Sequence, residues 1–98
     1  RTDSLIFKER DAKWLDALRD IRARARVQAR IERLALGHSG DVRSVGESVC
    51  ELRIDYGPGY RVYFTNRGCD VVILLAGGDK RTQGSDIRTA LRLARSLL

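Results

Sequence analysis

Methionine is absent from the 98-residue sequence, and histidine, tryptophan and proline occur once each. No apolar run approaches the ~18 residues that a membrane-spanning helix needs, so we expect a soluble protein. No segment has the features of a signal peptide, which favours the cytoplasm. Because the sequence starts at Arg1 without a methionine, we expect that its natural N-terminus is not fully shown. Linkers, repeats and low-complexity segments are lacking, so we predict a single domain, residues 1–98.

The sequence has only two cysteines and one histidine, and their positions do not indicate a metal or redox site. Cys50 falls in a predicted strand and Cys69 in a predicted turn, without metal-binding or redox spacing, so we expect reduced thiols. The sole histidine, His38, lies in a polar loop that offers no obvious orienting partner. We interpret it as loop surface, and we predict no metal ligands and no cofactor.

Basic residues outnumber acidic ones by 19 to 13, which gives a net charge of +6 and a pI near 10.0. Such a balance favours a polyanion or an acidic protein as partner. Most of the basic residues are arginine, whose planar guanidinium binds phosphate or carboxylate through two donors at once.

Residues 51–65 predict a β-hairpin with two chemically different faces. Apolar residues alternate with polar ones along both arms, so one face is apolar and the other carries Arg53, Arg61 and Tyr63. A three-residue turn, Gly57-Pro58-Gly59, would place Asp55 opposite Arg61 and Arg53 opposite Tyr63. We expect the polar face to stay open to a ligand.

The rest of the chain predicts an α+β fold with the order strand, two helices, three-stranded antiparallel meander, helix. We expect the helices to pack on the apolar face of the sheet. The predicted elements are an N-terminal strand (4–8), a helix capped by Asp11 with Trp14 in the core, a helix from the cap Asp20 to Leu36 that ends at Gly37, a loop (37–48), a second turn (66–70), a central strand covered on both sides (71–75), a polar loop (76–83) and a last helix from about Ser85.

One side of the second predicted helix carries arginines at spacings of three and four, from Arg19 to Arg33. This stripe has two readings. It is either a solvated helix face or a docking face for RNA phosphates or an acidic partner.

Several strings of the sequence resemble the RelE/ParE superfamily of bacterial toxins, and most of all its HigB-type "addiction module killer" branch. They span nearly the whole chain. The matching strings are Trp14-Leu15-x-x-Leu18, Gly40-Asp-Val42, Glu51-Leu-Arg53, Gly57-Pro-Gly-Tyr-Arg-Val-Tyr-Phe64 and Leu75-Ala-Gly-Gly-Asp-Lys80, with Thr82-Gln83 and Asp86-Ile87 following.

This resemblance implies the toxin of a type II toxin–antitoxin module, held inactive by a cognate antitoxin. Many such toxins cut mRNA on the ribosome without a metal, whereas the ParE-like ones inhibit DNA gyrase without cutting RNA. A third reading is a basic RNA-binding domain with no chemistry, for which RNA binding would be salt-sensitive.

The resemblance also implies roles for individual residues. Arg61 matches the family arginine that holds the scissile phosphate, and Lys80 and Arg81 stand where RNA-cleaving relatives place another basic residue. Those relatives carry lysines where this chain has Glu51 and Arg53, and a tyrosine near the position that holds Ile87 here.

Cleavage without a metal requires a base for the 2′-hydroxyl, charge stabilisation at the phosphate and an acid for the leaving oxygen. We assign charge stabilisation to Arg61 and Arg53, the base to Glu51 and the acid to Lys80. For RNA binding we assign Arg81, Tyr63 and Arg43, with Tyr63 walling the face or stacking a base. The alternative for Arg61 is a simple cross-strand ion pair with Asp55.

Overall fold

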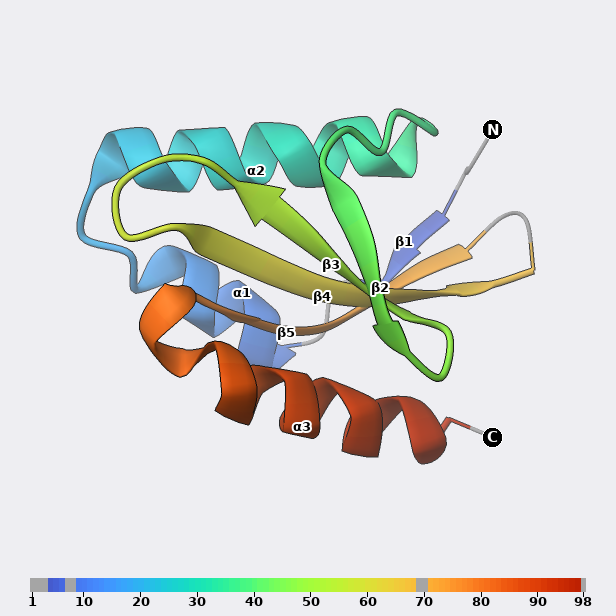
Figure 1. Ribbon diagram of the computed structural model, residues 1–98. Coiled ribbons are helices and arrows are strands. Elements are labelled where there is room, and N and C mark those ends of the chain that lie inside the picture. The colour runs from blue at the N-terminus through green and yellow to red at the C-terminus, as the bar shows by residue number, and fades with distance from the viewer. Residues whose placement is uncertain (1–3, 7–8, 69–70, 98) are drawn as a thin grey trace.

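The computed structural model describes residues 4–6, 9–68 and 71–97. Their strands form one sheet of order β1-β5-β4-β3-β2, in which β1 runs parallel to β5 and the other neighbours are antiparallel (Figure 1). The elements are β1 (Ser4–Ile6), α1 (Glu9–Asp16), α2 (Ile21–Ala35), β2 (Val42–Gly46), β3 (Val49–Ile54), β4 (Tyr60–Arg67), β5 (Val71–Gly78), the 3-10 helix η1 (Lys80–Thr82) and α3 (Gln83–Arg95).

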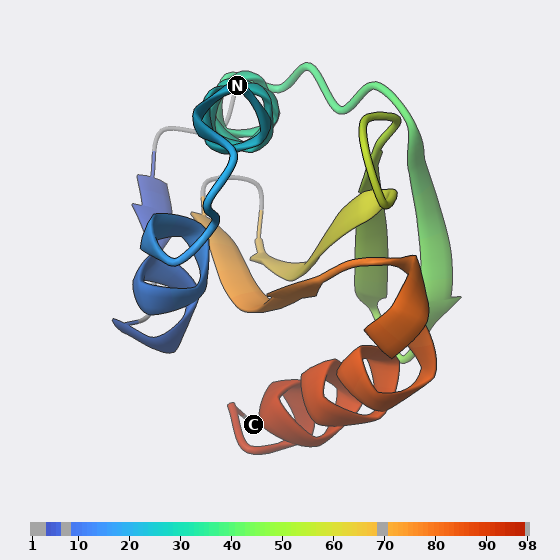
Figure 2. The ribbon, with the colours of Figure 1, turned by 90° about the vertical axis from the view of Figure 1, so that its left-hand side faces the viewer.

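Helices cover both faces of the sheet. α1 and α2 pack on one face, over a core that includes Leu52, Val62 and Leu74, and α3 packs on the opposite face, over Tyr63 and Leu75 (Figure 2). The expectation that all helices share one face is therefore wrong. The central strand gives the reason, because its side chains are apolar on both faces and both must leave water.

Local signals in the sequence set the bounds of α2 as predicted. The Asp20 carboxylate accepts hydrogen bonds from Arg22 N at 2.9 Å and Ala23 N at 3.3 Å, so Asp20 is the N-cap. Gly37 has a φ of +92° just past the helix end, the left-handed conformation that favours glycine. The prediction for Asp11 is wrong, since α1 starts at Glu9 and Asp11 is buried within it.

The hairpin of β3 and β4 exists, but its register differs by two residues from our prediction. Arg53 pairs with Arg61 and Ile54 with Tyr60, so five residues, 55–59, connect the strands. A hydrogen bond from Gly59 N to Tyr56 O at 3.1 Å closes this connection. Because a shift of two preserves side-chain parity, the faces stay as predicted, but Asp55 does not lie opposite Arg61.

The predicted loop 37–48 contains the edge strand β2, so the meander has four strands rather than three. Glu47 and Ser48, with φ values of 50° and 66°, form the two-residue turn into β3. The central strand is confirmed and extends to Gly78, and the last helix starts at Gln83. Residues 7–8 of the predicted first strand, and Cys69 and residue 70 of the predicted second turn, lie outside the described residues.

The remaining sequence expectations concern single side chains. Trp14 is partly buried against the core, with its ring edge-on to Tyr60 at 6.5 Å between centroids, as expected of a core residue. His38 is exposed, as predicted. Cys50 is a free thiol whose pKa is raised by burial. Within the part of the chain that the structure describes, no helix is both long and apolar enough to cross a membrane.

Candidate functional site

Three of the four predicted catalytic residues line a single open pocket at one end of the sheet. Arg53 comes from the end of β3, Arg61 from the start of β4, and Lys80 follows β5. The cavity measures about 400 Å³ and its other lining residues are Asp41, Ile54, Asp55, Gly59 and Tyr60. The chain thus gathers three cations from three segments around a hollow large enough for a phosphodiester group.

Gly59 lies close to both Arg61 and Lys80. A Cβ atom added at Gly59 would lie 3.2 Å from Nη1 of Arg61 and 3.7 Å from Cβ of Lys80. The Lys80 N–H also donates to Pro58 O at 3.4 Å, which ties the segment after β5 to the hairpin connection. Lys80 is exposed, and within the described ranges its ammonium makes no ion pair.

Arg61 is more enclosed than its expected role suggested. The residue is only 5% exposed, and its Nη1 donates to Gly59 O at 2.7 Å. Its Nε lies 3.5 Å from Oε2 of Glu51. Arg53, directly opposite on β3, is 38% exposed at its side chain and therefore offers the more accessible guanidinium.

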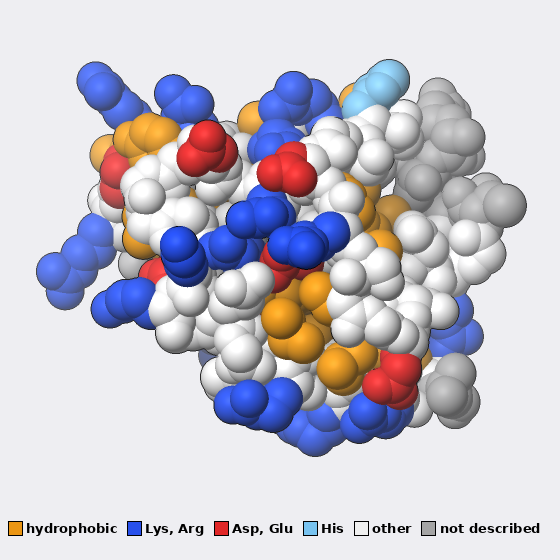
Figure 3. All heavy atoms as spheres, in the orientation of Figure 1, with side chains coloured by type: hydrophobic (Ala, Val, Ile, Leu, Met, Phe, Trp, Pro, Cys, Tyr) orange, Lys and Arg blue, Asp and Glu red, His pale blue; other side chains and the backbone are white. Residues whose placement is uncertain are grey.

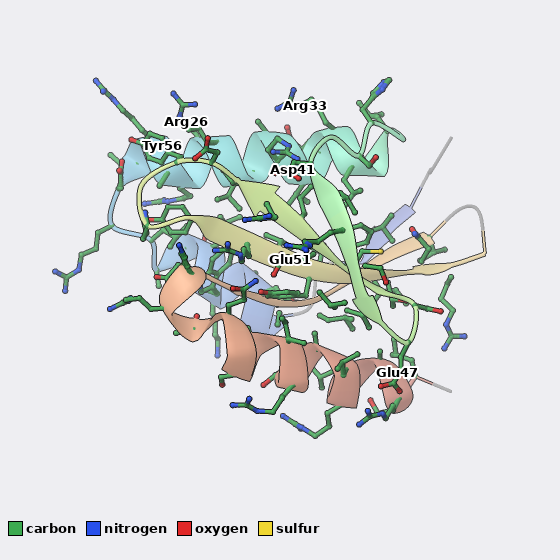
Figure 4. The ribbon with its side chains drawn as sticks, viewed as in Figure 1. Arg26, Arg33, Asp41, Glu47, Glu51 and Tyr56 are labelled. Atoms are coloured by element: carbon green, nitrogen blue, oxygen red, sulfur yellow. The ribbon has the colours of Figure 1, made fainter. Side chains whose placement is uncertain are left out.

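Glu51 lies between the sheet and α3 and is fully buried (Figure 4). Its Oε2 accepts hydrogen bonds from the Tyr63 hydroxyl at 2.8 Å and from Nε2 of Gln83 at 2.9 Å, and its Oε1 lies 3.8 Å from Nε of Arg53. A carboxylate with 0% exposure does not reach a substrate in this arrangement. The geometry therefore disagrees with our assignment of Glu51 as the general base.

Tyr63 is also closed off, contrary to the expectation of an open polar face. It has 0% exposure under α3, so it has no surface on which a base could stack. Burial, together with the hydrogen bond to Glu51 and the charge of that carboxylate, raises the pKa of Tyr63 far above its ordinary value. The phenol stays protonated and serves as a donor to Glu51.

Arg81 and Arg43 are exposed, but neither of them lines the pocket. The Arg81 side chain is 83% exposed and pairs with Asp79 at 3.3 Å. Partial burial opposes ionisation of Asp79, but the hydrogen bonds from Arg81 outweigh it and hold the pKa of Asp79 below its ordinary value. Arg43, exposed on β2, pairs in register with Glu51. Basic side chains gather over β2 and β3 at the centre of the face in Figure 3.

The start of η1 fixes the position of Lys80. Asp79 accepts from Arg81 N at 2.8 Å while Thr82 Oγ1 accepts from Asp79 N at 3.3 Å, which forms a capping box. Gly78 allows this turn to lie against the strand, since a Cβ there would be 2.6 Å from Thr82 Oγ1 and 1.9 Å from Oδ2 of Asp86.

Two acidic residues of the pocket were not predicted as site residues, and Asp55 was named only as an alternative ion-pair partner of Arg61. Asp41 and Asp55 are both exposed and both line the cavity. The N–H of Arg53 donates to Asp41 O at 3.0 Å, which fixes the backbone of Asp41 beside β3. A signal for Asp41 was present, since it belongs to one of the strings that resemble the toxins, but only the pairing of β2 with β3 brings it to the pocket.

Part of the arginine stripe on α2 is engaged within the protein. Arg30 donates from Nη1 to Arg53 O at 2.9 Å and from Nη2 to Ser39 O at 3.3 Å, so it links α2 to the pocket. The guanidinium of Arg26 lies 4.6 Å from the centre of the Tyr56 ring (Figure 4). Arg22 and Arg33 of α2 are exposed, and so is Arg19, which precedes the helix.

The structure has a second cavity of similar size. A cavity of about 440 Å³ lies at the opposite end of the sheet, where Arg95 and Glu47 form an ion pair at 2.6 Å. Among residues 4–6, 9–68 and 71–97, no group of three or more His, Cys, Asp or Glu side chains could hold a metal ion. The basic pocket is thus the best-supported site.

The α+β architecture, with a four-stranded antiparallel meander and a C-terminal helix, is compatible with a RelE-like fold. The family described as Phage derived protein Gp49-like (DUF891) matches residues 13–97. A protein of Haemophilus influenzae, described as uncharacterized, is 52% identical over 84 residues, which cover 86% of this chain and 85% of the relative. No solved structure matches the chain significantly.

The family match shows that the chain belongs to the class of RelE/ParE-like toxins of toxin–antitoxin modules, and the α+β fold is compatible with that class. Within that superfamily, the chain belongs to the Gp49-like family, whose members are toxins of such modules. Membership of this family implies an antitoxin as partner.

Proposed function

We propose that this toxin is a metal-independent, ribosome-dependent mRNA endoribonuclease of the HigB-like kind, which arrests translation in the cytoplasm. The observation that carries the proposal is the convergence of Arg53, Arg61 and Lys80 on one open pocket. Guanidinium groups are suited to the equatorial oxygens of a phosphorane, on which negative charge builds up as RNA is cut.

The reaction is a transesterification within the RNA. The 2′-oxygen forms a bond to phosphorus while the bond to the 5′-oxygen breaks, which leaves a cyclic phosphate and a 5′-hydroxyl end. Arg53 and Arg61 stabilise the phosphorane, and Lys80 gives a proton to the 5′-oxygen. Because Glu51 is buried, an exposed carboxylate of the pocket, Asp41 or Asp55, takes the proton of the 2′-hydroxyl.

The surface around the pocket supports RNA as the ligand. Arg81 follows Lys80 in the chain and Arg43 lies two residues after Asp41; both are exposed and would contact phosphates that flank the cleaved bond. The same positive surface suits an acidic segment of the antitoxin, which would then compete with mRNA for the pocket.

The test is to map 5′ ends of cellular mRNA after induction of wild type, Lys80→Met and Arg53→Gln, with Arg88→Gln on the exposed face of α3 as a matched control. Wild type and the control should arrest growth and produce new 5′ ends, and the two pocket variants should lose both while still binding antitoxin. Pocket variants that cleave as fast as wild type would contradict the proposal.

One observation favours a second candidate, a ParE-like toxin that inhibits DNA gyrase without cutting RNA. Arg61 is 95% enclosed and two of its nitrogens are engaged within the protein, so it offers less to a substrate than expected. Induction of the DNA-damage response with intact mRNA would support gyrase as the target. Intact mRNA without that response, but with salt-sensitive RNA binding, would indicate a binding domain without chemistry.

A further inference from the structure

Two arginines lie directly opposite each other at the pocket. Arg53 of β3 and Arg61 of β4 are register partners, so their side chains leave the sheet on the same face. Like charges at directly opposed positions of an antiparallel pair repel each other. Since Arg61 is also only 5% exposed, water screens this repulsion poorly. We therefore expect a negative charge close to both guanidinium groups to offset this repulsion.

Glu51 is the acidic group that reaches both guanidinium groups. Its Oε1 lies 3.8 Å from Nε of Arg53, and its Oε2 lies 3.5 Å from Nε of Arg61. Burial of an unpaired carboxylate would be costly, but Tyr63 and Gln83 donate hydrogen bonds to Oε2 at 2.8 Å and 2.9 Å. One buried carboxylate is therefore shared by two arginines and two neutral donors from three elements.

We propose that Glu51 is a positioning residue, which holds the guanidinium groups of Arg53 and Arg61 side by side with their outer nitrogens toward the pocket. Its significance for catalysis rests on the nuclease function proposed above, whereas the geometric role does not. Gln83 contributes to the same arrangement, because it is the first residue of α3 and its hydrogen bond connects that helix to Glu51.

The contacts of Arg61 show how the orientation arises. Its Nη1 donates to Gly59 O at 2.7 Å, and its Nε faces the Glu51 carboxylate at 3.5 Å in an ion pair without a hydrogen bond, so one hydrogen bond and one charge contact orient the guanidinium. Within the described residues, Nη2 makes no hydrogen bond, which leaves that nitrogen for a ligand in the pocket. Loss of the Glu51 charge would remove this ion pair and leave the two cations to repel each other.

A nuclear magnetic resonance experiment tests the geometric role without any need for cleavage. The Nε–H signals of Arg53 and Arg61 should be resolved in wild type, and Glu51→Gln, which keeps the size and removes the charge, should shift or broaden both. Glu47→Gln is the matched control, since it breaks the exposed ion pair with Arg95 at the other end of the sheet. Unchanged Arg53 and Arg61 signals in Glu51→Gln would overturn the proposal.

Cleavage of mRNA on purified ribosomes tests the catalytic consequence. If Glu51 only positions the arginines, Glu51→Gln should lower kcat by about tenfold or more, with KM little changed and the pH profile retaining its shape. If the acidic limb of the pH profile of kcat, which reports ionisation of the base, disappears in Glu51→Gln, then Glu51 is the base and the proposal is overturned. If wild type cleaves nothing, the nuclease function fails, and the resonance experiment still decides the geometric role.

A second variant covers the case in which Glu51→Gln does not fold. Gln83→Met removes one hydrogen bond to Oε2 at a partly buried helix position and leaves both ion pairs in place. It should move the Nε–H signal of Arg61 more than that of Arg95 and lower kcat by a smaller factor than Glu51→Gln. A folded Gln83→Met with wild-type signals and wild-type kcat would overturn the part assigned to Gln83.

Discussion

Replacement of Gly77 by alanine tests the packing that holds β5 against α1. A Cβ atom at Gly77 would lie 2.4, 2.6 and 2.7 Å from three carbons of the Trp14 ring. Ordinary carbon–carbon contacts are about 3.5–4.0 Å, so the ring or the strand must move by about 1 Å. The ring also packs against Tyr60, with 6.5 Å between the ring centroids, so a shift of the ring would disturb that contact as well.

The magnitude follows from two opposing effects. Overpacking of a well-packed core costs about 1–3 kcal/mol, whereas replacing glycine by alanine inside a strand gains about 0.5–1 kcal/mol in chain entropy. We expect Gly77→Ala to lower the free energy of unfolding by about 1–2 kcal/mol. For a chain of this size that is a fall in Tm of about 4–8 °C per kcal/mol.

Urea and thermal unfolding followed by far-ultraviolet circular dichroism measure this effect. Gly84→Ala is the control, because a Cβ there would lie 3.7 Å from Nη1 of Arg88, an ordinary contact, and it should stabilise α3 by up to about 1 kcal/mol. The double variant Gly77→Ala/Trp14→Leu should lose less free energy of unfolding than the sum of the losses of the two single variants, since the smaller side chain leaves room for the added methyl group. A neutral Gly77→Ala, or strictly additive effects in the double variant, would refute this account of the packing.

Two further predictions concern local structure. Ser48→Gly should raise the free energy of unfolding by about 1 kcal/mol in urea unfolding, because Ser48 has a φ of 66° that glycine adopts without cost, and an unchanged or lower stability would contradict this. The hydrogen bond from the N–H of Ala23 is the largest cause that holds the pKa of Asp20 below its ordinary value. The negative charge of Asp20 therefore stabilises the fold at neutral pH. This contribution is lost as the pH falls through the lowered pKa. The stability difference between wild type and Asp20→Asn, which keeps a capping oxygen, should therefore shrink from about pH 6 to about pH 2 in urea melts, and a constant difference would argue against the linkage.

Interactions between near neighbours in the chain were open to prediction from the sequence. The cap Asp20 and the helix end at Gly37 each depend on residues within about two turns of helix, and both are confirmed. The alternation of residues 51–54 and 60–65 also gave the correct side-chain faces of β3 and β4, because strand parity depends only on the local backbone.

The candidate site depended on contacts between distant segments. Arg53, Arg61 and Lys80 were recognised from their types and from family strings, but Asp41 reaches the same pocket only because β2 pairs with β3. The predicted turn gave the wrong register, since a shift of two residues keeps every side chain on its face and so leaves no trace in the pattern.

The sequence by itself determined the presence of the three helices, the cap of α2, the parity of the strands and the excess of arginine that favours an anionic partner. Only the tertiary structure decided that α3 covers the polar face, which buries Glu51 and Tyr63 and leaves Arg61 almost enclosed. The physical reason is that the apolar side chains of β5 on that face, such as Ile73 and Leu75, must be buried, and the helix that buries them also covers their polar neighbours. A carboxylate that looks like a surface base in sequence thereby becomes the buried partner of two arginines.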